Sequence, residues 1–161
     1  MNDDVWNDKP HELRLDLPAA HSAARMARQI LRQFALREGV PEKEVQTLEF
    51  VAGELLGNAV DHGGGEAALE ESHLESAARM TLLFASTTEH WELRVGDQGG
   101  AEPEEVSDLL APNEDEFPDL ENERGRGFFL IKAMVDELAV EKSSDGLGLE
   151  FKTVRRYVRG E

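Results

Sequence analysis

Two long helical patterns follow one another directly near the start of the chain, and they constrain the fold more than any other feature. From Ala19 to Glu38, small and apolar residues recur at helical spacing, and Gly39 is placed to cap the helix end. From Pro41 to about His62 a second helical pattern follows, with Pro41 at a favourable first-turn position. Both helices have an apolar side that must be buried against another element.

Period-two alternation of apolar and polar residues predicts the strands that supply this apolar partner. Hairpin turns between them favour a mixed, mostly antiparallel sheet, and a third helix is predicted from Phe128 onward. Three helices suffice to cover one face of such a sheet, so the predicted fold is an α/β (α+β) two-layer sandwich. The predicted strands are 11–17, 78–86, 90–95, 138–142 and 147–157.

Composition narrows the class of protein. A chain of 161 residues predicts a single domain over 1–161, and it contains no cysteine for disulfides, thiolate metal sites or a thiol nucleophile. The net charge of −17 argues against direct nucleic-acid binding. No apolar run is long enough for a membrane span and the first residues are acidic, which predicts a cytoplasmic protein. Arg25, Arg28 and Arg32 form a basic stripe on the first helix, which is either solvated or meets an acidic partner.

A first candidate site lies on the second helix. Glu54, Asn58 and Asp61 fall at i, i+4 and i+7 and share one face, roughly opposite the apolar one. Gly53 and Gly57 weaken the helix without improving solubility, which suggests that something approaches it closely. From spacing alone, a solvated face and a binding site are both open readings.

Two further candidates lie downstream. In the first, Asp97 follows a predicted strand and is followed by Gly99 and Gly100. By itself this pattern predicts a turn. In the second, Gly125-Arg126-Gly127 stands directly before the third predicted helix, where backbone N–H groups and the helix dipole favour phosphate. Between them lies a proline- and carboxylate-rich stretch, which as a long insertion is either functional or disordered.

Taken in this order, the three clusters resemble the boxes of the GHKL ATPase superfamily. That superfamily includes gyrase, heat-shock chaperone, histidine kinase and mismatch-repair ATPases, and the closest pattern is that of the small anti-sigma-factor serine kinases. An N box, E-x-x-x-N-A-x-x-H, reads here as ELLGNAVDH from Glu54; a D-x-G box reads as DQGGA from Asp97; and a glycine-rich box reads as GRGFFLI from Gly125. The resemblance covers nearly the whole chain and implies the histidine-kinase-like ATPase (Bergerat) fold, with a flexible ATP lid at 99–124.

The resemblance also implies cofactors and residue roles. The cofactors are ATP and Mg²⁺, with Asn58 as the metal ligand that bridges to the phosphates and Glu54 as the catalytic general base. Asp97 is expected to accept a hydrogen bond from the adenine amino group, and Gly99 to let the base come close. The glycine-rich box, Gly125, Arg126 and Gly127, is expected to hold phosphates.

Within the superfamily, a free-standing domain fits the serine kinase branch. The implied function is an ATP-dependent protein-serine kinase and anti-sigma factor, a homodimer that binds a sigma factor and phosphorylates a serine on an antagonist protein. Two positions depart from the pattern: Ala101 replaces the second glycine of the D-x-G-x-G box, and Leu147 stands where a threonine is expected. An alternative is therefore a non-catalytic module of the same fold that uses ATP or ADP as a conformational switch.

Overall fold

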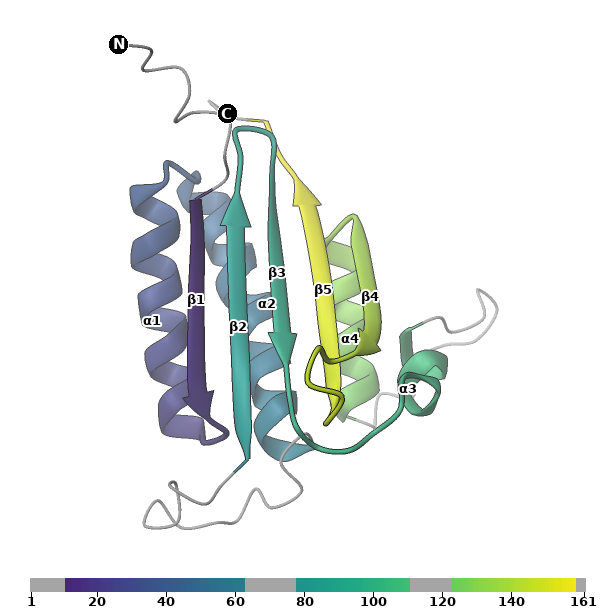
Figure 1. The fold of residues 1–161 in the computed structure, drawn as a ribbon. Helices are drawn as coiled ribbons and strands as arrows, with labels where there is room; N and C mark the ends of the chain where they lie inside the picture. The colour runs from purple at the N-terminus through teal and green to yellow at the C-terminus, as the bar shows by residue number, and fades with distance from the viewer. Residues whose placement is uncertain (1–10, 63–77, 111–122, 159–161) are drawn as a thin grey trace.

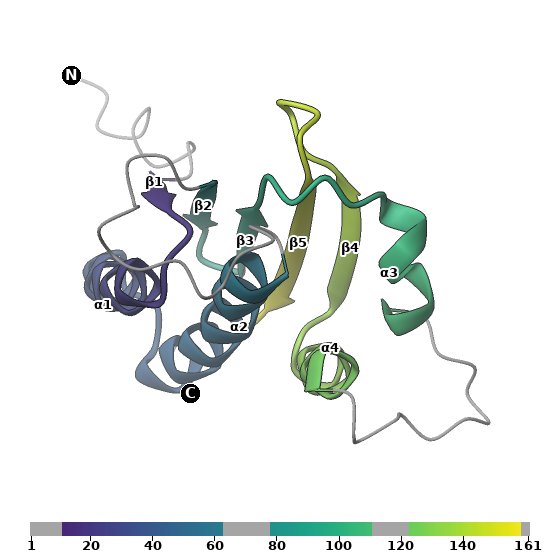
Figure 2. The ribbon, with the colours of Figure 1, turned by 90° about the horizontal axis from the view of Figure 1, so that it is seen from below.

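The computed structural model describes residues 11–62, 78–110 and 123–158, which form a sheet with helices on one face. The sheet has five strands in the order β1-β2-β3-β5-β4, and every neighbouring pair is antiparallel. The side view in Figure 2 shows α1, α2 and α4 under one face of the sheet, with α3 beside β4. The strands are β1 (His11–Pro18), β2 (Arg79–Ser86), β3 (His90–Gly96), β4 (Glu137–Lys142) and β5 (Leu149–Arg156).

Four helices occur among the described residues, one more than the sequence predicts. They are α1 (His21–Arg37), α2 (Glu42–Asp61), α3 (Pro103–Leu110) and α4 (Glu123–Met134). The expected two-layer sandwich is confirmed, and α1 and α2 begin and end within two residues of their predicted limits. No described helix is both long enough and apolar enough to span a membrane.

Two expectations about the segment after Asp97 were wrong. Its first part is not an irregular loop, because Pro103–Leu110 forms α3 with acidic residues in the first turn. The glycine-rich box does not stand before the last helix but inside its first turns, since α4 already begins at Glu123. Residues 111–122, the centre of the expected lid, lie outside the described residues. So do residues 63–77, where three consecutive glycines after the second helical pattern predict a loop.

The core lies between the sheet and the helices. Small side chains let α1 approach the sheet closely, since Ala23, Ala27 and Ala35 are buried on its inner side together with Leu31. The core also fixes α4, because Phe128 stacks on Phe151 of β5 with ring centroids 5.3 Å apart.

A partly buried ion pair joins three elements at the other end of α4. The Arg155 guanidinium on β5 binds Glu44 of α2 through two hydrogen bonds, of 2.5 and 3.2 Å, and also donates to the Met134 carbonyl at the end of α4. The hydrogen bonds that Arg155 donates to the Glu44 carboxylate raise the pKa of Arg155 above its ordinary value. This pair fixes α2 and α4, the two helices that carry candidate site residues, to the same strand.

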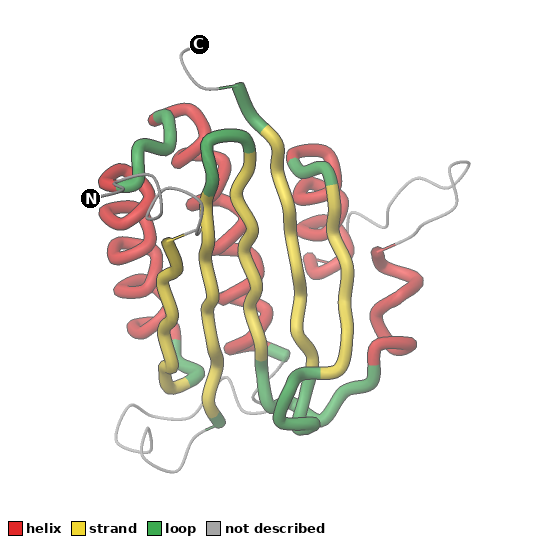
Figure 3. Tube along the Cα trace, turned by 45° about the horizontal axis from the view of Figure 1, so that its top comes forward, coloured by secondary structure: helices red, strands yellow, loops and turns green. Residues whose placement is uncertain are grey.

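The chain places all the candidate segments at one edge of the sheet. In Figure 1 the last turns of α2, the end of β3, the start of α4 and the turn between β4 and β5 all lie along the lower edge. The tube in Figure 3 shows the same grouping from another direction. Segments that are far apart in sequence therefore meet at the end of β3, directly before Asp97.

Candidate functional site

The N box and the glycine-rich box are in direct contact. Gly127 of α4 is buried, and a Cβ added there would lie 2.6 Å from Oε2 of Glu54 on α2. Real Cβ atoms do not approach an oxygen so closely, so only glycine allows the carboxylate to lie against the first turns of α4. The structure thus brings together two of the residues that the sequence singled out.

Asn58 lies one turn after Glu54 on α2, and its surroundings are unusual for an amide. The residue is 9% exposed, and its Nδ2 is buried with no hydrogen-bond partner within the described part of the chain. Buried amide groups are almost always hydrogen-bonded, so an unsatisfied one needs an explanation. A ligand oxygen beside α2 would satisfy this N–H donor, and the oxygen of the same amide is of the kind that binds Mg²⁺.

Asp97 is the most tightly held of the candidate residues. Its side chain is buried, and Oδ1 accepts hydrogen bonds from the backbone N–H groups of Gly99, at 3.0 Å, and Leu149, at 3.2 Å. The backbone N–H of Asp97 also donates to the Leu149 carbonyl at 2.9 Å. Among the described residues nothing hydrogen-bonds to Oδ2, so this oxygen is free to accept from a ligand.

Gly148 completes the Asp97 site, and the sequence reading missed it. A Cβ at Gly148 would lie 2.7 Å from the carbonyl carbon of Asp97 and closer still to its Oδ1 and backbone oxygen. The sequence feature that could have pointed to Gly148 is the second glycine of the Gly-Leu-Gly run at 146–148, because a turn alone does not require it. Glycine at 148 is therefore what allows the hairpin end to pack on Asp97.

The loop after Asp97 is shaped around Gly100. This residue has a φ of +78°, and its N–H donates to the Leu147 carbonyl at 2.8 Å. Glycine takes up this left-handed conformation without strain. Gly100, which stands one position before Ala101 in the D-x-G-x-G box, therefore has a structural role in the loop. Leu147 contributes its backbone to this contact, while its side chain is 54% exposed.

Side chains that the sequence reading did not single out fasten this loop to the β4–β5 turn. Gln98 accepts from the Arg79 N–H at 2.9 Å and donates to Asp145 at 3.2 Å, and Lys142 donates to the Ala101 carbonyl at 3.3 Å. The Leu147 N–H, followed by the Ser143 hydroxyl and Gln98, holds the pKa of Asp145 below its ordinary value. The loop and the turn therefore form one hydrogen-bonded unit.

The remaining residues of the glycine-rich box lie near the N-terminal end of α4. Gly125 is half-buried and Arg126 is exposed. The first turns of a helix present backbone N–H groups and the positive end of the dipole, which favours phosphate oxygens. The close packing of Gly127 on Glu54 places the first turns of α4 beside the carboxylate on α2.

The comparison with family models decides what this arrangement belongs to. A model described as a histidine kinase-like ATPase domain matches residues 17–153, which include all three boxes. The chain belongs to this family. No match is found among curated protein sequences.

Solved structures agree with the histidine kinase-like ATPase fold. A chain of the SiaB–SiaC complex from Pseudomonas aeruginosa is similar with a TM-score of 0.63 and 18% identity, over 90% of this chain and 89% of that one. The RsbU and RsbW domains of Rv1364c from Mycobacterium tuberculosis give a TM-score of 0.58 and 18% identity, over 92% of this chain and 34% of that one. At these identities the likeness establishes the fold, and this chain spans about a third of the mycobacterial one.

The residues of this ATPase domain fit the nucleotide and cation that the family name implies. The chain offers an amide with unsatisfied hydrogen-bonding capacity at Asn58, a free carboxylate oxygen at Asp97, and close-packed glycines at 127 and 148. Among the described residues, no cluster of three or more His, Cys, Asp or Glu side chains could hold a metal without further ligands.

Proposed function

We propose that the protein is an ATP-dependent protein-serine kinase that acts as an anti-sigma factor. It would bind a sigma factor and phosphorylate a serine on an antagonist protein. The observation that supports this most directly is the packing of Gly127 against Glu54, one turn before Asn58 on the same helix. A carboxylate, an amide ligand and a phosphate-binding helix start then converge on one place.

Each residue has a defined task in this proposal. Asp97 would accept a hydrogen bond from the adenine amino group through Oδ2, with Gly99 leaving room for the base. Asn58 would hold the cation through its amide oxygen. Gly125 and Gly127 would present the first turns of α4 to the phosphates, with the positive charge of Arg126 close by.

Glu54 is the proposed catalytic residue. It would accept the proton of the attacking serine hydroxyl while the serine oxygen bonds to phosphorus and the bond to the ADP oxygen breaks. ATP would supply the phosphoryl group, and Mg²⁺ would spread its negative charge. The contact with Gly127 would orient the carboxylate toward the acceptor.

Phosphate transfer from radiolabelled ATP to a co-expressed antagonist tests this function. Glu54→Gln should bind Mg-ATP and lose transfer by about 100-fold or more, the usual contribution of a general base. Asn58→Ala should lose both binding and transfer. Glu42→Gln is the matched control, because Glu42 lies on the same helix, is exposed and pairs with Arg32; it should transfer at the wild-type rate.

The alternative is a non-catalytic module that uses ATP or ADP as a conformational switch. ATP binding by the wild type with no transfer, and with Glu54→Gln indistinguishable from it, would select this alternative. Absence of binding at millimolar ATP would contradict both. We also propose a cytoplasmic homodimer, as the resemblance implies, for which light scattering on the purified protein should give twice the 17.9 kDa chain mass.

A further inference from the structure

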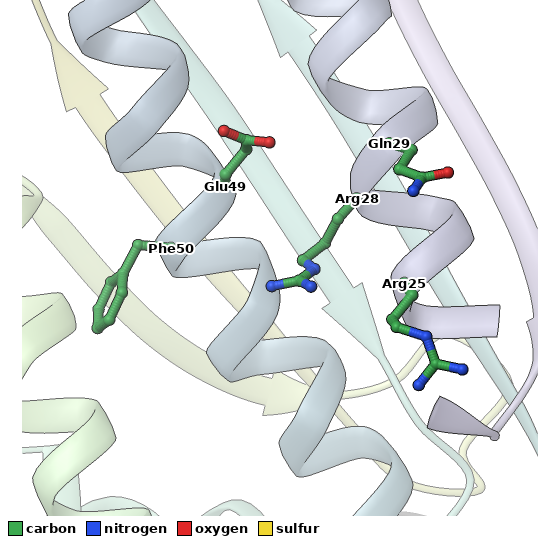
Figure 4. Close-up of a pocket in the computed structure, with 5 residues that line it drawn as sticks. All are labelled: Arg25, Arg28, Gln29, Glu49 and Phe50. Carbon is green, nitrogen blue, oxygen red and sulfur yellow. The ribbon is translucent and has the colours of Figure 1, made fainter. Parts of the chain in front are cut away.

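A cavity of about 310 Å³ opens between α1 and α2, away from the sheet. Figure 4 shows Arg28 extending from α1 toward α2, Arg25 extending alongside α1, and Phe50 leaving α2 on the side away from α1, with the strands behind both helices. The lining consists of Arg25, Arg28, Gln29, Glu49 and Phe50. None of these residues has a role in the nucleotide site proposed above.

The cavity carries positive charge that no described residue neutralises. Arg32, the third arginine of the basic stripe, pairs with Glu42 at 2.6 Å and with Glu49 at 2.9 Å. Among the described residues that line the cavity, Glu49 is the acidic one, and its carboxylate already accepts a hydrogen bond from Arg32. Arg25 and Arg28 have no ion pair with any described residue, although the chain as a whole carries a charge of −17.

The Arg28 side chain also lies close to α2. A Cβ added at Gly53 would lie 3.1 Å from Nη1 and 3.3 Å from Cδ of Arg28. The Arg28 side chain therefore lies across α2 at the position where Gly53 has no side chain. The expectation that something approaches α2 closely is therefore confirmed at Gly53, whereas Gly57 has nothing within 4 Å.

Exposed apolar side chains also occur on α1. Met26 and Ile30 are 50% and 37% exposed, and neither lines the cavity. Phe50 belongs to the lining, with its ring on the side of α2 away from α1. Arginine is enriched in surfaces that bind proteins, so the two arginines are the residues that a partner would contact here.

We propose that this cavity is the docking point for an acidic segment of a protein partner, whose carboxylates pair with Arg25 and Arg28. The volume is near the lower limit of ligand cavities, and it suits one or two acidic side chains. A long polyanion such as nucleic acid is disfavoured, because it would meet the repulsion of a surface with net charge −17 beyond the cavity.

Peptide display on the intact protein tests this proposal. A random 16-residue library is selected on the wild type, and the affinities of enriched peptides are measured by fluorescence anisotropy without nucleotide. The peptides should be rich in Asp and Glu and should bind R25Q/R28Q at least tenfold more weakly, about 1.4 kcal/mol. Arg37→Gln is the matched control on the same helix, since Arg37 is exposed and lies outside the cavity; it should bind nearly as the wild type does.

A second variant separates position from charge. Gly53→Ala leaves every charge in place but displaces the Arg28 side chain, so it should weaken peptide binding while the thermal stability stays equal or rises. Selected peptides that bind R25Q/R28Q as well as the wild type, or that are not acidic, would overturn the proposal. So would an Arg25- and Arg28-dependent affinity for a single-stranded DNA 12-mer or for phosphatidylserine vesicles that exceeds the peptide affinity. Because no ATP is present, failure here leaves the proposed kinase function untouched.

Discussion

Gly148→Ala is the substitution that most sharply tests how the Asp97 site is built. The added methyl group would lie 2.7 Å from the Asp97 carbonyl carbon and closer to two of its oxygens. Two of these three atoms belong to the backbone, so rotation of a side chain cannot relieve the clash. Asp97 and the β4–β5 turn must instead move apart.

The size of the effect follows from that movement. Ordinary contact requires about 3.5 Å, so the two segments must separate by roughly 1 Å. The hydrogen bonds between Asp97 and Leu149, of 2.9 and 3.2 Å, oppose this separation. Overpacking costs about 1–3 kcal/mol, and weakening a hydrogen bond to a buried carboxylate adds about 1 kcal/mol. We therefore expect a loss of about 2–4 kcal/mol in the free energy of unfolding.

Thermal unfolding followed by circular dichroism measures this loss, which should lower Tm by roughly 5–15 °C. Gly57→Ala is the control, because nothing lies within 4 Å of its added Cβ in the middle of α2. Alanine there should raise the stability by about 0.5–1 kcal/mol. A Gly148→Ala protein whose Tm matches the wild type would refute the packing of the turn on Asp97.

Three further substitutions test other parts of the account. Gly127→Ala places a Cβ 2.6 Å from the mobile end of Glu54, so Tm should change little while phosphate transfer falls, as parallel melts and transfer assays will show. Arg155→Met leaves Glu44 buried without its partner and should cost about 2–3 kcal/mol in urea unfolding, with part regained when Glu44 is also replaced by Leu. The lowered pKa of Asp145 gives stability that is present above pH 3.8 and is lost as the pH falls through the folded-state pKa. The Tm of Asp145→Asn, measured in thermal melts from about pH 5 to 2, should therefore depend less on pH than that of the wild type.

The sequence predicted those helices and strands in which apolar residues, buried in the structure, recur at a regular spacing. In β1, for example, alternation of apolar and polar residues gave a strand within one residue of the observed end. It failed at α3, where prolines and carboxylates around residues 103–110 resemble a loop. It also placed the start of α4 too late, because Gly125 and Gly127 are poor helix formers and only tertiary packing explains them.

The candidate site was predicted by its motifs and not by its contacts. Glu54, Asn58 and Asp97 were selected from the sequence, but no local pattern reports that Gly127 packs on Glu54 from another helix. Nor could the sequence place Gly148 on Asp97, because the two residues are far apart in the chain and only the β3–β5 pairing brings them together. Such contacts depend on topology, which local periodicity does not encode.

The most direct test of the central claim is calorimetric titration of the protein with ATP, with and without Mg²⁺, for the wild type and Asp97→Asn. The account predicts Mg²⁺-dependent binding to the wild type, weaker binding of GTP, which lacks the adenine amino group, and loss of the ATP preference in Asp97→Asn. No heat of binding at millimolar ATP, or equal binding of ATP by wild type and variant, would contradict it.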